Sequence, residues 1–258
     1  MTNSFGRFYL LSVKKKAIIL FITVCSLSGC GPDMAVTRPP RKLGKYPLVI
    51  YLEGKGYGKN EPFSRQEISR VLSDAGFLVW VPERKPVSNG PLKGLCEAEY
   101  ICKKTLEKAL RNPAVDQNNI NVIGFCLGSL AAFNSMHYSN IRSMILMDFG
   151  APFYDPALSN KAHTSVNTAD YSKISAGILV IVSSDDDKLS LEPAEILRGK
   201  MAEAENKIDC IEYLAEDRHY LQDALKYLTG QRIDTVERIE INSQHLEKWN
   251  RIRKSGYW

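Results

Sequence analysis

The chain has 258 residues, enough for one large domain or two small ones, and its 44% hydrophobic and 24% charged residues are ordinary for a globular protein. The formal net charge is +5, but Arg7 and the lysines at 14–16 supply four of those charges. Without them the chain is nearly neutral, which gives no reason to expect nucleic acid as a partner.

The first thirty residues have the pattern of a secretory signal peptide. Three lysines at 14–16 precede an apolar run at 17–24, and no acidic residue occurs before Asp33. The run is shorter than the roughly 20 apolar residues that cross a bilayer. We predict a signal peptide over 1–29, and the alternative is a buried N-terminal helix.

The end of this segment, LSGC at 27–30, resembles the lipobox of bacterial lipoproteins. The resemblance implies cleavage before Cys30, which then carries lipid as the new N-terminus. Gly31 follows it, so nothing resembles the signal for retention in an inner membrane. We expect a cell-envelope protein held to the membrane by this lipid, on the periplasmic side or the cell surface, and in the outer membrane if the organism has one. Residues 30–46, rich in Pro, Gly, Lys and Arg, are predicted to form a tether after the lipid.

Strands and helices alternate from residue 47 onward. Apolar runs typical of strands buried on both faces occupy 47–52, 77–82, 119–125, 143–150 and 177–183, with a short strand at 210–214. Helical spacing covers 64–76 (with Ser64 as its N-cap), 97–112, 127–136, 192–206 and 220–229. This alternation predicts an α/β domain over 47–230, with a mostly parallel sheet and helices on both faces.

Two other segments complete the domain organisation. Residues 151–176 have weak periodicity and contain two prolines, so we expect a loop or small cap over the carboxyl edge of the sheet, where open sheets bind ligands. Residues 231–258 are predicted to be a C-terminal helical extension, with a helix over about 235–254.

The cysteines of the folded part are Cys96, Cys102, Cys126 and Cys210. Export places them in an oxidising compartment, where disulfides are possible. Cys96 and Cys102 either pair across a short loop or are two reduced cysteines of a helix. No C-x-x-C pair or His/Cys cluster suggests zinc, and we expect neither a metal nor another cofactor.

One cysteine stands in a catalytic pattern. The strand 119–125 runs into G-F-C-L-G at 124–128 and then into a helix, a pattern that resembles the nucleophile elbow of α/β-hydrolases with Cys126 at its centre. Glycines at both ends of the turn avoid clashes, and the start of the helix favours a thiolate or an oxyanion. The Leu127 amide is expected to be one oxyanion donor. The alternative is a tight junction around a buried free cysteine.

The catalytic base is expected after the acid in this fold, because the order of the triad is nucleophile, acid, histidine. His137 and His163 precede any suitable acid. His219 lies between the strand 210–214 and the following helix, where the base belongs, whereas His245 lies in the charged terminal helix and is more typical of a surface residue. We therefore predict that His219 takes the thiol proton of the nucleophile.

The acid is expected after the strand 177–183, in the run Asp185-Asp186-Asp187. In the hydrolase pattern the acid stands three residues after the small residue that ends the strand, which gives Asp186, with Asp185 as the second choice. Each of these residues is also a common turn former. The carboxylate would orient the imidazole of the base and stabilise its charged form. The predicted reaction passes through a thioester on the cysteine, which water then hydrolyses.

The segment GFCLGSLAAF at 124–133 resembles the nucleophile segment of the dienelactone hydrolase family, and the order of motifs agrees over 47–229. The resemblance implies that Glu53 holds or receives the thiol proton until substrate arrives, and that the Gly54 amide is the second oxyanion donor. A solvent-exposed loop carboxylate is the alternative for Glu53. The chain departs from the family at Ser129, where a second glycine is usual. It also lacks arginines at secure positions to bind a substrate carboxylate, which leaves the substrate open.

These features predict an exported, lipid-anchored hydrolase of a small ester, lactone or thioester. The alternative is a non-catalytic envelope lipoprotein that uses the same scaffold to bind a ligand or partner. A third interpretation gives Cys126 a thiol-redox or acyl-transfer role without net hydrolysis.

Overall fold

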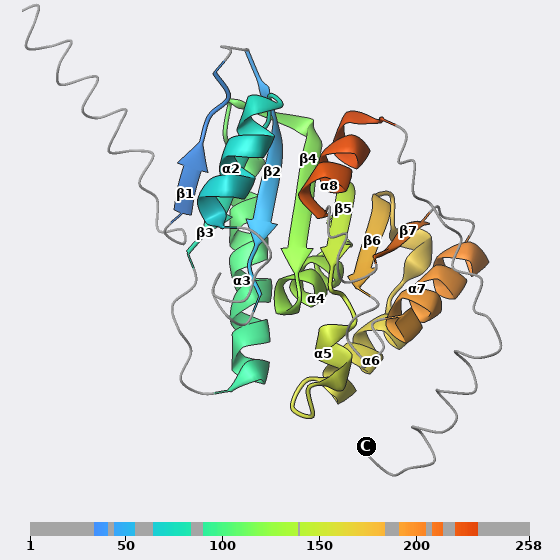
Figure 1. Cartoon of the computed structure of the whole chain (residues 1–258). Helices are drawn as coiled ribbons and strands as arrows, with labels where there is room; N and C mark the ends of the chain where they lie inside the picture. Colours follow the sequence, from blue (N-terminus) through green and yellow to red (C-terminus); the bar gives the residue numbers. More distant parts are fainter. Residues whose placement is uncertain are drawn as a thin grey trace, which may run out of the picture. The chain divides into compact units, whose positions relative to one another are not determined.

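A sheet of seven strands organises the part of the chain that the computed structural model describes (Figure 1). That part comprises residues 34–40, 44–54, 64–83, 90–138, 140–183, 191–204, 208–213 and 220–231. The strands are β1 (Met34–Thr37), β2 (Tyr46–Leu52), β3 (Leu78–Pro82), β4 (Val115–Phe125), β5 (Ile141–Met147), β6 (Gly177–Ser183) and β7 (Ile208–Tyr213). Their order across the sheet is β1-β3-β2-β4-β5-β6-β7.

Strands β2 to β7 run parallel to one another, and only β1 among the described strands is antiparallel to its neighbour, β3. The predicted strands are all present, with ends that shift by up to four residues. Parallel strands carry their carboxyl ends to one edge, so the residues that follow β2, β4 and β5 are neighbours. This edge is where the predicted site belongs.

The helices are α2 (Arg65–Asp74), α3 (Pro91–Ala109), α4 (Leu127–Asn134), α5 (Ala151–Tyr154), α6 (Ser159–Thr168), α7 (Leu191–Glu203) and α8 (Tyr220–Thr229), with a short 3-10 helix, η1 (Tyr171–Lys173). Helices α2 and α8 cover one face of the sheet, and α3, α4 and α7 cover the other (Figure 1). The predicted sheet with helices on both faces is therefore confirmed. Ser64 caps α2 as expected, since its side chain accepts a hydrogen bond from the Glu67 amide at 3.1 Å.

Two hydrophobic cores follow from the alternation of side chains along the strands. In β2, Leu48, Ile50 and Leu52 pack on the face of α3 and α4, while Val49 and Tyr51 pack on the face of α2. All five side chains are at most 1% exposed. Burial on both faces explains why this strand reads as an unbroken apolar run.

The prediction of a tether over 30–46 is wrong at 34–37, which form β1 on the edge of the sheet. Its pairing partner lies in β3, where Val81 is opposite Ala35. This four-residue strand has half-buried ends and two exposed residues between them, so it carries no buried apolar run that would mark it in the sequence.

The segment 151–176 was expected to be either a loop or a small cap. It contains the helices α5 and α6 and the 3-10 helix η1, so it is not a plain loop. These elements lie beyond the carboxyl ends of β4 and β5 (Figure 1), as expected for a small cap. Helix α6 buries only Ala162 and Val166, which explains its weak periodicity. The predicted terminal helix at 235–254 lies outside the described residues.

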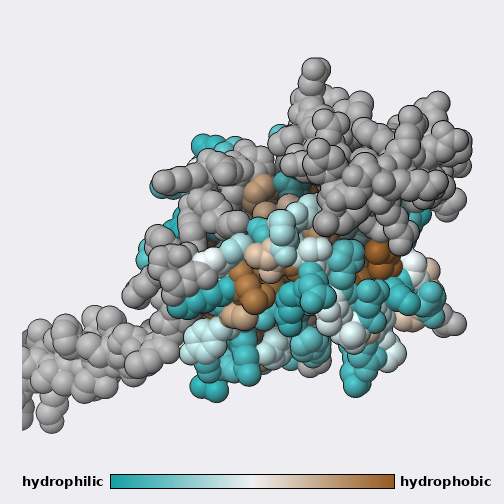
Figure 2. Space-filling model, turned by 90° about the horizontal axis from the view of Figure 1, so that it is seen from below, coloured by the Kyte–Doolittle hydropathy of each residue, from teal (hydrophilic) through white to brown (hydrophobic). Residues whose placement is uncertain are grey.

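The face seen in Figure 2 is mostly hydrophilic over the described residues, and its hydrophobic side chains form small separate patches. Among the described residues, the large hydrophobic side chains that are exposed are Val36, Leu92 and Tyr100. No helix in the described ranges has both the length and the apolar character that a membrane span requires.

Candidate active site

Cys126 occupies a strained turn between β4 and α4. Its backbone has φ 50° and ψ −115°, a conformation that residues other than glycine rarely adopt. Its N–H donates a hydrogen bond of 2.8 Å to the carbonyl oxygen of Met147 at the end of β5. The turn therefore holds the thiol at the carboxyl edge of the sheet, as the elbow pattern predicts.

The glycines on either side of the turn are required by backbone packing. A Cβ atom on Gly124 would overlap the backbone of Gly128, and a Cβ atom on Gly128 would overlap the carbonyl oxygens of Leu52 and Glu53. Backbone atoms cannot yield as a flexible side chain can. The spacing G-x-C-x-G thus lets α4 start directly against the end of β2.

The first turn of α4 closes on the carbonyl oxygen of Cys126. That oxygen accepts hydrogen bonds from the amides of Ser129 at 2.9 Å and Leu130 at 3.4 Å, and from the Ser129 hydroxyl at 2.5 Å. The hydroxyl makes a bond that the usual glycine of the family segment would not make. The amino end of the helix lies at the nucleophile, where its partial positive charge favours a thiolate or an oxyanion.

Gly54 lies directly beside the nucleophile. A Cβ atom built on Gly54 would lie 3.3 Å from the Cβ atom of Cys126 and 3.0 Å from a ring carbon of Phe125. Gly54 and Leu127, the two residues expected to supply oxyanion donors, therefore both lie next to Cys126.

Glu53 is 1% exposed, so the alternative of a solvent-exposed loop carboxylate is wrong. Arg65, the first residue of α2, holds it with two hydrogen bonds, Nε to Oε1 and Nη2 to Oε2. The fork of a guanidinium matches both oxygens of a carboxylate, which compensates the buried charge. Sequence analysis missed Arg65, although the burial of Glu53 would itself have called for a nearby cation.

Several predicted site residues lie outside the described residues: Asp186 and its second choice Asp185, His219 and the lipidation site Cys30. His245, which was not favoured as the base, lies outside them as well. Strands β6 and β7, which precede the predicted acid and base, run parallel to β4 and end at the same edge. The triad of Cys126, Asp186 and His219 therefore remains a prediction.

The other two histidines are part of the described structure. His163 in α6 packs edge-on against Phe153, with ring centroids 5.1 Å apart. His137 follows α4 and lies beside Tyr138, with centroids 6.0 Å apart. Neither was expected to act as the base.

Of the two alternatives for Cys96 and Cys102, the disulfide is wrong and the pair of reduced helical cysteines is confirmed. Both residues are free, and both belong to helix α3. Six residues along a helix separate them by about 9 Å, beyond the reach of a disulfide. Cys96 is exposed and Cys102 is buried. Burial raises the pKa of the Cys102 thiol to about 11, against the lowering effect of a hydrogen bond from Ser135, so this thiol stays protonated.

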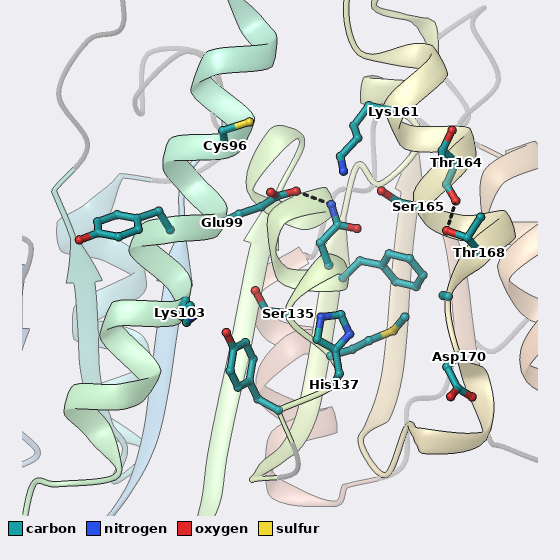
Figure 3. Close-up of a pocket in the computed structure, with 16 residues that line it drawn as sticks. Cys96, Glu99, Lys103, Ser135, His137, Lys161, Thr164, Ser165, Thr168 and Asp170 are labelled. Atoms are coloured by element: carbon teal, nitrogen blue, oxygen red, sulfur yellow. Dashed lines mark hydrogen bonds between the residues drawn. The ribbon is translucent and has the colours of Figure 1, made fainter.

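A polar groove of about 550 Å³ lies between α3, the end of α4 and α6 (Figure 3). Glu99 and Lys161 point into it from opposite sides. The amide of Asn134 donates to Glu99 at 2.5 Å, and the Thr164 hydroxyl donates to a carbonyl of its own helix at 2.7 Å. Cys126 does not line the groove, and Asn134 lies eight residues further along α4, about 12 Å away. The groove is therefore separate from the elbow.

Comparison with known proteins agrees with this geometry. The sequence profile of the dienelactone hydrolase family matches residues 93–222, just over half of the chain, including the elbow. No curated protein matches the chain.

Solved structures share the α/β-hydrolase fold at low sequence identity. A Klebsiella pneumoniae protein described as a dienelactone hydrolase is 15% identical, with a TM-score of 0.55 over 87% of this chain and 98% of that one. Est1E from Butyrivibrio proteoclasticus, solved with ferulic acid, is 13% identical, with a TM-score of 0.58 over 77% and 92%. Dipeptidyl peptidase 4 from Porphyromonas gingivalis is 13% identical, with a TM-score of 0.61 over 78% of this chain but only 34% of that one.

Proposed function

Since the chain belongs to the dienelactone hydrolase family and is a hydrolase of that type, we propose that it cleaves an ester, lactone or thioester with Cys126 as its nucleophile. The observation that supports this most is the backbone of Cys126, strained at φ 50° at the amino end of α4. A structural cysteine has no need of that conformation, because a small residue with a negative φ would connect a strand and a helix without strain.

The proposed reaction begins with transfer of the Cys126 proton to His219. The thiolate attacks the substrate carbonyl carbon, and the tetrahedral intermediate collapses when the alcohol or thiol leaves with the proton from His219. The resulting acyl-cysteine is attacked by water, which His219 deprotonates, and the acid product leaves as the thiol is restored. Asp186 orients the imidazole and stabilises its charged form.

The oxyanion of each tetrahedral intermediate would be bound by the amides of Leu127 and Gly54. Leu127 is the first residue of α4, where amides have no partner within the helix. Gly54 comes so close to Cys126 that only glycine fits without displacing Phe125. Two amides fixed in the backbone would stabilise the developing negative charge without reorganisation.

Glu53 is proposed to hold or receive the thiol proton before substrate binds. It follows β2 directly and precedes Gly54, which contacts the nucleophile. Its charge is compensated by Arg65, which makes Arg65 a positioning residue for this carboxylate. The ion pair also ties α2 to the edge of the sheet that carries the site.

The site is further proposed to operate in the cell envelope, on a chain whose residues 1–29 are removed and whose Cys30 carries lipid. The support is the sequence alone, from the basic start through LSGC at 27–30. Lipid attachment would restrict the enzyme to substrates that reach the membrane surface.

The test is hydrolysis of a panel of p-nitrophenyl esters and lactones by wild type and by Cys126→Ala, with Cys96→Ala as the matched control. We expect Cys126→Ala to lose about a thousandfold or more of kcat/KM, and the exposed Cys96 of α3 to be dispensable. His219→Ala should lose a similar factor and His245→Ala should not. Equal activity of wild type and Cys126→Ala would refute the nucleophile.

A further inference from the structure

Hydrogen bonds fix the backbone of Cys126 at both of its polar groups. Its carbonyl oxygen accepts from the amides of Ser129 at 2.9 Å and Leu130 at 3.4 Å, and from the Ser129 hydroxyl at 2.5 Å. Its N–H donates to the carbonyl oxygen of Met147 at 2.8 Å. A backbone with φ 50° needs this support, because a strained conformation persists only where its surroundings over-determine it.

The Ser129 hydroxyl is the side-chain donor among these groups. Ser129 is 0% exposed, so bulk water does not compete for its hydroxyl. The residue is packed between the end of β4 and the first turn of α4, since a Cβ atom on Gly124 would lie 2.5 Å from the Cα atom of Ser129. A serine hydroxyl that bonds to a carbonyl one turn back is common in helices, but here that carbonyl belongs to the nucleophile.

The carbonyl of Cys126 and the N–H of Leu127 belong to one planar peptide unit. No peptide bond in the described ranges is cis, so this N–H points opposite to the carbonyl. The carbonyl points into α4, toward its donors on Ser129 and Leu130. The Leu127 N–H therefore points out of the amino end of the helix. Whatever holds the carbonyl oxygen also sets the direction of the amide that is proposed as an oxyanion donor.

The hydroxyl affects the strength of this donor as well as its direction. A hydrogen bond to the carbonyl oxygen polarises the peptide unit, which makes the N–H at its other end a stronger donor. Without the hydroxyl, the amides of Ser129 and Leu130 still bond to the Cys126 carbonyl, so α4 can form. Loss of the hydroxyl should therefore loosen and weaken the oxyanion donor while leaving the fold in place.

We propose that Ser129 is a positioning residue for the oxyanion hole, because its hydroxyl holds the Cys126 carbonyl and thereby aims and polarises the Leu127 amide. This inference rests on the proposed function and deepens it. It also gives a role to the serine that stands where the family segment usually has a second glycine.

The first measurement is hydrolysis of p-nitrophenyl butyrate. Ser129→Ala and Ser129→Gly should each lower kcat about tenfold with KM unchanged, because the oxyanion forms in the transition states and not in the bound substrate. Ser135→Ala is the matched control. The Ser135 hydroxyl is also buried and donates to a carbonyl of α4, that of Ala131, at 2.9 Å, but at the far end of the helix. The control should lower the urea midpoint as Ser129→Ala does and keep the kcat of wild type.

Alkylation by iodoacetamide separates the aim of the donor from the position of the thiol. The thiolate of Cys126 forms a bond to carbon as iodide leaves, and no oxyanion develops. Its rate, followed by peptide mass, should stay within about twofold of wild type in Ser129→Ala. A loss of alkylation equal to the loss of hydrolysis would overturn the proposal, because the nucleophile itself would then have moved. A wild-type kcat in Ser129→Ala, or an equal loss in Ser135→Ala, would overturn it too.

Butanal separates this inference from the proposed function. The Cys126 sulfur bonds to the aldehyde carbon and the thiol proton passes to the oxygen, which gives a hemithioacetal with its oxygen at the oxyanion position. Its affinity, measured as protection from iodoacetamide, should fall about tenfold in Ser129→Ala and stay unchanged in Ser135→Ala.

The outcomes with butanal and with the ester are distinct. A wild type that hydrolyses no ester but shows this difference in affinity would refute the proposed function alone. Hydrolysis without the difference would refute the role of Ser129. Addition of butanal to wild type no tighter than its addition to 2-mercaptoethanol would refute the oxyanion hole, and with it both proposals.

Discussion

The amide of Cys126 and the carbonyl oxygen of Met147 form a 2.8 Å hydrogen bond that fastens the nucleophile turn to the neighbouring strand β5. On its other side the same turn touches Gly54, whose Cβ position would be 3.3 Å from that of Cys126. The thiol is thus located by backbone contacts with β2 and β5, which a sheet of parallel strands supplies at its carboxyl edge.

Gly128→Ala should destabilise the protein by about 3 kcal/mol or prevent folding, because the added methyl group overlaps carbonyl oxygens at the end of β2. Urea denaturation measures the change. Gly199→Ala is the matched control, since a Cβ atom there meets nothing within 4 Å and the residue lies inside α7. The control should stabilise by up to about 1 kcal/mol, through helix propensity. Equal stability of Gly128→Ala and wild type would contradict the packing of the elbow.

Arg65→Met should cost about 2 to 3 kcal/mol of unfolding free energy, since it leaves the Glu53 carboxylate buried without its cation. This is below the usual cost of breaking a buried pair because a third of the Arg65 side chain is exposed. Adding Glu53→Gln should recover part of the loss. A double-mutant cycle by urea denaturation measures the coupling, and additive effects would show that the two side chains do not interact.

The protein should lose stability as pH rises from about 9 to 11, in part through Cys102. Burial raises the folded pKa of this thiol to about 11 from an ordinary value of 9.0. Between these values the unfolded chain releases the proton and the folded one retains it, so the contribution present below pH 9 falls by about 2 to 3 kcal/mol. Cys102→Ala should flatten this part of the curve of unfolding free energy against pH. A slope equal to that of wild type would argue against the burial of the thiol.

At the N-terminus we predict cleavage of the signal peptide and attachment of lipid to Cys30. In a bacterial host, the wild-type chain should lose residues 1–29, incorporate labelled fatty acid and partition into detergent. Cys30→Ala should remain unprocessed and unlabelled, because lipid attachment and cleavage both depend on that thiol. Labelling that persists in Cys30→Ala would place the lipid elsewhere, and a wild-type chain without label would remove the proposed anchor.

The sheet and the elbow were predictable because their signals are local. Each buried strand carries its own apolar run, and G-x-C-x-G requires no partner to be recognised. Strand β1 was missed since its four residues pair only through β3. Helix α6 was missed because it buries only two side chains, Ala162 and Val166, so its sequence has weak helical periodicity.

The surroundings of the nucleophile were predictable only in part. Glu53 was found through a family resemblance, but its partner Arg65 lies at the start of helix α2, twelve residues later. Asp148 fell within the predicted strand over 143–150. Strand β5 ends at Met147, and the positive φ of the next residue is a property of the folded backbone that composition does not reveal.

The most direct test of the account is detection of the acyl-cysteine. Wild-type protein mixed with a p-nitrophenyl ester and quenched with acid should show a burst of one equivalent of p-nitrophenol, and mass spectrometry should find one acyl group on the peptide that contains Cys126. Cys126→Ala should show neither. Turnover by wild type without any acyl group on that peptide, or with the acyl group on another residue, would contradict the nucleophile assigned to the strained turn between β4 and α4.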